Sequence, residues 1–355
     1  MTRPSALASR GMFSKFGTFL KFAGNQRRNA ARIASELSPF DPQAMALDGG
    51  EADWQDSGFV ATAGANFRAV VSGHLWLAKP LALGFDADQV IWLRIGGAGP
   101  IRKVQGPETV FTAWADGPVE VMAKGLSFWT SDSGTYTPAK RKAAAGKVGI
   151  KIAPTEDMAD QHDLPPGWSY HWQIGEGRVY GRPQDDDGTV QDDTAVQVNT
   201  HGDVGILRYD IERDFAPGLT LDWDWLIENL PSPVAEDMVF THDYLSIAVE
   251  FDNGLDLTYM WSAELPEGFV FQCPLDGWCD LETHWVVRSG EQGLGEWHTE
   301  SRDLWADYPR AISGELPKKA VSVWLIANSI FGRNKAAANF RNIKLLANAG
   351  EEPAA

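Results

Sequence analysis

Strict alternation of apolar and polar side chains is the feature that most constrains how this chain can fold. The clearest example is residues 219–225, where the apolar positions are Leu219, Leu221, Trp223 and Trp225. The same alternation recurs in residues 245–251 and 255–261, and the turn sequence Asp-Asn-Gly joins them at residues 252–254. A period of two buries one face of a strand and leaves the other in water. The second half is therefore expected to be an antiparallel β sandwich of jelly-roll type.

Short apolar runs separated by Gly and Pro occupy the first half of the chain. The expected strands are residues 69–76, 90–95, 109–114, 119–122 and 148–152. Runs of this length, rich in β-branched and aromatic residues, are typical of a sandwich. The chain is thus predicted to be all-β, with two antiparallel β-sandwich domains in tandem. The expected boundaries are a helical segment at residues 1–47, a first sandwich at 48–155 and a second at 156–350.

The first 35 residues differ from the rest because all of their ionisable side chains are basic. Apolar residues recur there at helical spacing: Met12, Phe13, Phe16, Phe19, Leu20 and Ala23. Lys15 and Lys21 interrupt the apolar run, so the segment does not read as a clear secretory signal. An amphipathic helix is expected, ending at Gly24 and Asn25. It could pack on the body of the protein, lie on an anionic membrane surface or dock into a larger assembly.

Composition excludes several classes of protein. The 355 residues carry a formal charge of -17, which disfavours binding to a phosphate backbone, so no nucleic acid is expected as a partner. No stretch is apolar for long enough to span a bilayer. A cytoplasmic or assembly-associated location is favoured, and a homo-oligomer is open. The two cysteines, Cys273 and Cys279, are too few for a disulfide scaffold, and a bond between them and two free thiols are both open.

Five separated motifs of the first half resemble one known family. They are residues 70–74 (VVSGH), 91–96 (IWLRIG), 111–113 (FTA), 117–121 (GPVEV) and 131–136 (SDSGTY). Together they are similar to the LecA-type bacterial galactose-binding lectin, in which a calcium ion holds the sugar. The family's calcium ligands fall at Lys124, Phe128, Ser131 and Asp132, and neither an ammonium group nor a phenyl ring can replace a calcium ligand. We therefore expect no calcium in this domain.

Calcium-independent sugar contact is what the lectin resemblance still implies. Trp76 or Trp129 would stack on the sugar ring, and Asp132 beside Ser131 would accept hydrogen bonds from its hydroxyls. The alternative is that both Trp side chains pack in the core of a lectin-shaped domain kept for structure.

The second half resembles a bacterial family of unknown function, number 3047. The motifs are residues 164–168 (LPPGW), 221–225 (LDWDW), 257–262 (LTYMWS), 286–290 (VVRSG), 295–297 (GEW) and 307–308 (DY). The resemblance implies a sandwich similar to carbohydrate-binding modules and implies no reaction. Tyr259 and Trp261 complete the candidate ligand-binding residues.

An acidic run offers the one candidate metal site, with Asp185, Asp187 and Asp192 as ligands for calcium. A solvated Asp-Gly turn is the alternative, and otherwise no cofactor is expected. His298 and Glu300 share one face of an expected strand and could exchange a proton. A helix is expected at residues 302–311, with Asp307 exposed.

These observations favour a carbohydrate-binding, lectin-like protein, such as an adhesin or spike component attached through its N-terminal segment. No catalytic residue is assigned, because the chain lacks the nucleophile-elbow, zinc-protease, phosphate-loop and dinucleotide motifs. A carbohydrate-active or small-molecule enzyme with a cleft on the second sandwich is the first alternative. A structural assembly subunit is the other.

Overall fold

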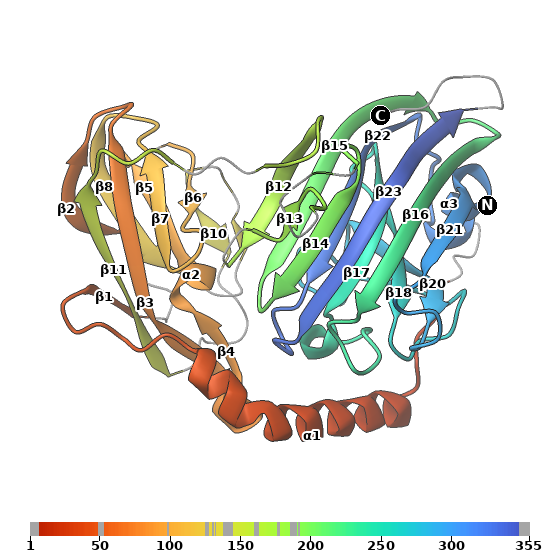
Figure 1. Ribbon diagram of the computed structural model, residues 1–355, viewed down its shortest axis with the longest axis horizontal. Coiled ribbons are helices and arrows are strands. Elements are labelled where there is room, and N and C mark those ends of the chain that lie inside the picture. The colour runs from red at the N-terminus through yellow and green to blue at the C-terminus, as the bar shows by residue number, and fades with distance from the viewer. Residues whose placement is uncertain are drawn as a thin grey trace. The chain divides into compact units, whose positions relative to one another are not determined.

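The computed structural model describes residues 7–48, 53–97, 99–124, 128–129, 131, 133–137, 145–159, 163–175, 178–184, 190 and 192–347 (Figure 1). The chain forms two compact units. The first domain holds residues 23–161 and 173–177, and the second domain holds the rest of the described chain. Strands dominate both domains, which confirms the expected all-β architecture.

Two larger sheets form most of the described part of the first domain. One has the order β1-β11-β3-β4, with β7 also paired to β3, and the other has the order β2-β8-β5-β6. Their strands are β1 (Met45–Asp48), β2 (Gln55–Ala61), β3 (Asn66–Ala78), β4 (Leu83–Asp86), β5 (Ile91–Ile95), β6 (Arg102–Lys103), β7 (Glu108–Thr112), β8 (Gly117–Ala123) and β11 (Gly146–Pro154). The short strands β9 (Phe128–Trp129) and β10 (Tyr136–Thr137) pair with each other, and the helical turns are η1 (Lys79–Leu81) and α2 (Ala87–Val90).

Gly73 explains how β3 and β11 approach so closely. Its φ is +87°, and a Cβ atom there would lie 2.2 Å from the carbonyl oxygen of Lys147 on β11. Only glycine adopts this backbone conformation and leaves that space free. The glycine in the 70–74 motif is thus required by strand pairing.

The second domain has a sheet of seven strands in the order β12-β15-β22-β17-β18-β20-β19 and one of five in the order β13-β14-β23-β16-β21 (Figure 1). The strands are β12 (Trp168–Ile174), β13 (Tyr180–Gly181), β14 (Val196–His201), β15 (Val204–Asp214), β16 (Leu219–Asn229), β17 (Tyr244–Phe251), β18 (Asp256–Ser262), β19 (Val270–Gln272), β20 (Glu282–Ser289), β21 (Trp297–Asp303), β22 (Lys319–Asn328) and β23 (Lys335–Ala347). The turn η2 (Val239–Thr241) precedes β17, and α3 (Leu304–Ala311) follows β21.

The main core of the second domain lies between these two sheets. The alternating positions of β16 turn inward, so Trp223 and Trp225 are 1% and 0% exposed. The ring centroid of Trp225 lies 5.7 Å from that of Trp261 on the opposite sheet. Burial of such large aromatic side chains contributes strongly to the stability of the core.

A crossover segment covers the other face of the seven-stranded sheet. β18 and β20 pair in parallel, so residues 263–281 must travel back along the sheet before β20 begins. The second, smaller core on this face contains Ala248, Met260, Phe271, Val286 and Trp324. Polar side chains that enter this layer are therefore removed from water.

Helix α1 (Met12–Glu36) confirms the predicted amphipathic helix but is longer than expected, because it continues through Gly24 and Asn25 to Glu36. Before it begins, Arg10 pairs with the carboxylate of Asp237. Within it, Lys21 lies 2.5 Å from Glu264. Four apolar side chains on α1 stay in contact with water: Met12 (84% exposed), Phe13 (93%), Phe16 (59%) and Leu20 (54%). No helix among the residues described is both long and apolar enough to cross a membrane.

Candidate functional site

Only some of the lectin-type positions of the first domain lie within the described residues. Trp76 is half-buried and packs edge-on against His74, with ring centroids 5.1 Å apart. The Ser131 hydroxyl accepts a hydrogen bond from the backbone N–H of Thr135 at 3.1 Å. The Trp129 side chain and Asp132 lie outside the described residues. Sugar contact at these positions stays a prediction.

Tyr259 and Trp261 require a correction. They are 0% and 1% exposed, because their alternating positions on β18 face the core rather than water. The Tyr259 hydroxyl donates to Asp307 at 3.0 Å, and the Trp261 indole N–H donates to the carbonyl oxygen of Gly290 at 2.8 Å. Neither ring offers a surface on which a ligand could stack.

Of the three candidate calcium ligands in the acidic run, only Asp192 lies within the described residues, so the calcium site stays a prediction. Asp185 and Asp187 lie outside the described residues. One oxygen of Asp192 accepts hydrogen bonds from the backbone N–H and the hydroxyl of Thr194, at 2.9 and 2.7 Å. These bonds lower the pKa of the Asp192 carboxyl, as in an ordinary capped turn.

Lys124, at a position where the lectin family has a calcium ligand, is 4% exposed and lies with its Nζ 5.8 Å from the centre of the Trp92 ring. Burial lowers the pKa of this amine to about 8.

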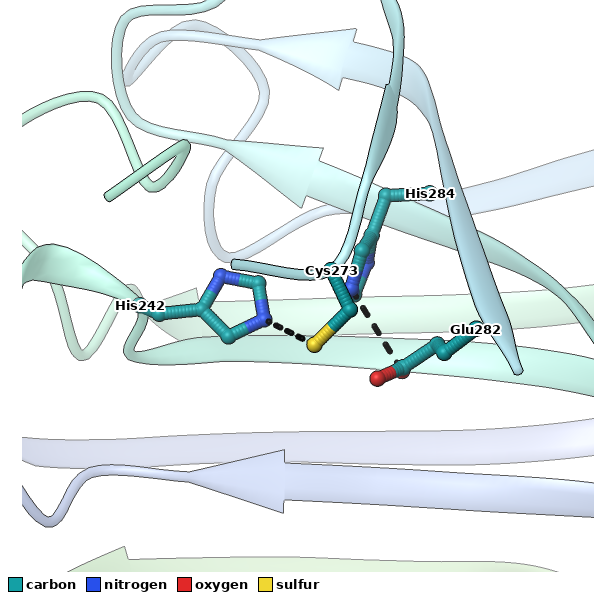
Figure 2. A group of neighbouring side chains, drawn as sticks. All are labelled: His242, Cys273, Glu282 and His284. Atoms are coloured by element: carbon teal, nitrogen blue, oxygen red, sulfur yellow. Dashed lines mark hydrogen bonds and ion pairs between the residues drawn. The ribbon is translucent and has the colours of Figure 1, made fainter. Parts of the chain in front are cut away.

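Four polar side chains meet instead under the crossover segment of the second domain (Figure 2). They are His242, Cys273, Glu282 and His284, and we call them the HCEH cluster. His242 follows η2, Cys273 follows β19, and the other two residues point to the same side of β20 because they are two positions apart. All four are buried, and their potential ligand atoms lie within 4.8 Å of one another.

Short contacts already link the HCEH cluster in two pairs. The Nε2 atom of His242 lies 3.4 Å from the Sγ atom of Cys273. The Nε2 atom of His284 lies 3.5 Å from Oε1 of Glu282. The rings of His242 and His284 are nearly perpendicular, with centroids 4.7 Å apart.

Neighbouring groups orient the members of the HCEH cluster. The His242 Nδ1–H donates to the backbone carbonyl of Glu236 at 2.7 Å, which leaves the Nε2 lone pair directed at Cys273. The Tyr244 hydroxyl donates to Oε1 of Glu282 at 2.8 Å. Burial, assisted by the neighbouring His284, lowers the pKa of His242 to about 3, so its ring is neutral at pH 7. Burial raises the pKa of the Cys273 thiol well above its usual range.

Sequence reasoning missed the HCEH cluster. The sequence leaves a Cys273–Cys279 bond and two free thiols both open, and the structure has two free thiols. The Glu-x-His spacing at residues 282–284 was the one available local signal, since alternate strand residues share a face. Nothing near His242 in the sequence indicates that it joins them.

A second group of polar side chains lies on the outward face of the five-stranded sheet. Trp297 is 39% exposed at the edge strand, and the Arg341 guanidinium lies 3.9 Å from the centre of its ring. Beside them, Asp224 accepts hydrogen bonds at 2.7 Å from both Thr299 and Asn342. We call these five residues the Trp297 face.

The two residues of the predicted proton-transfer pair, His298 and Glu300, do not contact each other. The Nε2 atom of His298 lies 2.9 Å from the carbonyl oxygen of Gly293. Glu300 pairs with Arg288 and accepts the Trp225 indole N–H at 3.2 Å. Each member is thus engaged by a different partner.

The fold and these groups define a protein with two β domains, one of them a sandwich with a buried cysteine–histidine–glutamate cluster. A family described as a protein of unknown function (DUF3047) matches residues 183–344, a little under half of the chain. This match agrees with the resemblance expected for the second half. It includes all four residues of the HCEH cluster and all five of the Trp297 face. No curated protein matches the chain.

Solved structures give distant likenesses. The xyloglucanase domain of NopAA, a type three effector from Sinorhizobium fredii, in complex with cellobiose is 9% identical, with 44% of this chain and 85% of that chain covered and a TM-score of 0.29. TmCBM61 in complex with beta-1,4-galactotriose is 9% identical, with 52% and 90% covered and a TM-score of 0.23. A carbohydrate-binding module from the beta-sandwich superfamily is 10% identical, with 84% and 99% covered and a TM-score of 0.25.

Because each of these TM-scores is below 0.5, the likenesses do not establish what this chain binds. The lectin-type resemblance of the first half is not supported by these matches and stays a prediction.

Proposed function

We propose that the protein binds carbohydrate, and that the Trp297 face of the second domain is the binding surface. The observation that carries the proposal is a partly exposed indole ring beside polar side chains held in place by hydrogen bonds. Asp224 is fixed by Thr299 and Asn342, while Arg341 stacks on Trp297. A surface ordered before binding loses little side-chain entropy when a ligand arrives.

The chemistry of the Trp297 face suits a sugar. A pyranose ring has an apolar C–H side that packs on an indole, and its hydroxyls both donate and accept hydrogen bonds. The carboxylate of Asp224 accepts such bonds, and Arg341 and Asn342 can donate them. Burial acts to raise the pKa of Asp224, but the hydrogen bonds donated by Thr299 and Asn342 outweigh it and keep the pKa below its usual value, so the side chain is an anion at neutral pH.

The test compares full-length variants on immobilised glycans and by affinity electrophoresis in gels that contain soluble polysaccharide. Trp297→Ala should weaken binding at least about tenfold, since loss of a buried aromatic contact removes roughly 1.5 kcal/mol or more. Phe13→Ala is the matched control, because this ring is 93% exposed and lies on α1. Equal binding by wild type and Trp297→Ala, or no binding to any glycan, would reject the proposal and favour the enzyme or assembly alternatives.

We further propose that the N-terminal segment attaches the protein to an anionic membrane surface, in keeping with an adhesin-like role. The supporting observation is the exposed apolar side of α1, with Met12, Phe13, Phe16 and Leu20 beside basic side chains. In co-sedimentation with vesicles of anionic lipid, Phe13→Ser/Phe16→Ser should pellet less than wild type. Equal pelleting of the two proteins would exclude attachment through this face.

A further inference from the structure

We propose that the HCEH cluster binds a single zinc ion through His242, Cys273, Glu282 and His284. Two imidazole nitrogens, one sulfur and one carboxylate oxygen are a ligand set of the kind that suits Zn²⁺. Calcium and magnesium prefer oxygen ligands alone, so they do not fit these four side chains. The site is separate from the Trp297 face, which lies on the other sheet.

The distances in the cluster support a tetrahedral site. Zinc bonds of about 2.0–2.3 Å place neighbouring ligand atoms about 3.3–3.7 Å apart. The separations His242 Nε2–Cys273 Sγ and His284 Nε2–Glu282 Oε1 are 3.4 and 3.5 Å. The other separations do not exceed 4.8 Å, which is within reach of small side-chain rotations.

The poorly satisfied ring of His284 is the independent sign of a ligand. His284 is 0% exposed; among the described residues its Nδ1 atom has no hydrogen-bond partner, and its Nε2 atom has the long 3.5 Å contact with Glu282. Leaving a buried polar group without a partner is unfavourable. Its Nε2 atom is on the side of the cluster (Figure 2), so a metal bond there would satisfy it.

The surrounding hydrogen bonds are those that metal ligands require. The bond from His242 Nδ1 to the Glu236 carbonyl fixes the tautomer in which Nε2 can bind a metal. Tyr244 holds the Glu282 carboxylate in the same way, with its hydroxyl 2.8 Å from Oε1. Such outer contacts orient the ligands before the metal arrives.

The zinc would be structural rather than catalytic. Four protein ligands complete a tetrahedron, and all four are buried, so no position is left for water or a substrate. Three of the ligands lie on β20 or beside β19, and the fourth follows η2. The ion would therefore fasten the crossover segment, residues 263–281, to the sheet beneath it.

The full-length protein is incubated with Zn²⁺ and then dialysed. Elemental mass spectrometry then measures the number of zinc ions retained per chain. Wild type and Cys279→Ser should each retain about one zinc per chain. Cys273→Ser and His284→Gln should retain little. Cys279→Ser is the matched control because its thiol is outside the cluster. Chelation should lower the Tm of wild type by at least about 5 °C and leave that of the cluster variants unchanged.

Wild type loaded with Co²⁺ gives a readout that does not depend on whether the variants fold. A thiolate-to-cobalt charge-transfer band is expected in wild type, and also in Cys279→Ser, if Cys273 is a ligand. Wild type without bound zinc, or zinc equally retained by Cys273→Ser, would each overturn the proposal. None of these results depends on glycan binding, so the two proposals fail separately.

Discussion

Replacing Asp307 by asparagine should destabilise the second domain strongly, although the residue lies on a short helix near the surface. Asp307 is 4% exposed and receives the Tyr259 hydroxyl at 3.0 Å. Arg302 donates to it through Nε at 2.8 Å and through Nη2 at 2.6 Å. Asparagine keeps the side-chain volume and can still accept from Tyr259, so the change isolates the negative charge.

The expected loss follows from the charge that remains. Removing one partner of a buried ion pair costs about 3–5 kcal/mol, because the other charge stays without compensation. The Arg302 side chain is still 24% exposed, so the lower end, about 3 kcal/mol, is expected for Asp307→Asn. Adding Arg302→Met removes the uncompensated charge, so the double variant should lose less than the two single changes together.

The assay is urea unfolding of the full-length protein, with the slope used to confirm that the variants unfold over the same surface. Asp303→Asn is the matched control on the same helix. Asp303 is exposed and caps α3 by accepting the Ala306 N–H at 3.0 Å, and asparagine caps helices as well as aspartate. A loss below about 1 kcal/mol for Asp307→Asn, or strictly additive single changes, would refute the buried-charge argument.

Two further predictions concern the first domain. Burial lowers the pKa of Lys103 to about 7, below its unfolded value, so the unfolded chain binds more protons between those values and stability should rise with pH from 7 to 9. Lys103→Met should reduce the slope of stability against pH by up to about 1.4 kcal/mol per pH unit. The measurement is urea unfolding of both proteins at several pH values. Equal slopes for wild type and Lys103→Met would contradict a lowered pKa at Lys103. Gly73→Ala should lower stability by about 1–3 kcal/mol, since φ there is +87° and the added carbon meets the Lys147 carbonyl oxygen. Gly58→Ala is the control, because Gly58 also has a positive φ but has open space around it. In differential scanning calorimetry it should lower stability less than Gly73→Ala. An equal loss would show that contact with the Lys147 carbonyl oxygen is unimportant.

Local patterns predicted the strands well because their causes are local. The alternation of residues 219–225 became β16, and the Asp-Asn-Gly sequence became the turn between β17 and β18, which pair from Leu245 and Trp261 to Glu250 and Asp256. The same alternation explains why Tyr259 and Trp261 are poor candidates for ligand contact. Large aromatic side chains at the apolar positions of such a strand are those that the core buries.

Properties that depend on distant partners could not be predicted in this way. Asp307 was expected in water, and it is buried because Tyr259, 48 residues earlier, lies beneath it. His242, Cys273 and the two ligands on β20 come together only because β18 and β20 are parallel neighbours. A single sequence contains no sign of that crossover, because it does not indicate which distant strands pair.

That parallel pairing also sets an order of assembly. The β17–β18 hairpin closes a loop of a few residues, whereas pairing Asp256 of β18 with Glu282 of β20 requires the whole intervening chain to close. Closure entropy grows with the logarithm of loop length, which makes the second event less favourable by about 1 kcal/mol before any contact compensates it. Contacts between distant residues also form slowly during folding. We therefore expect the hairpin to form early and β20 to dock late, so the four cluster side chains meet only when the sheet is nearly complete.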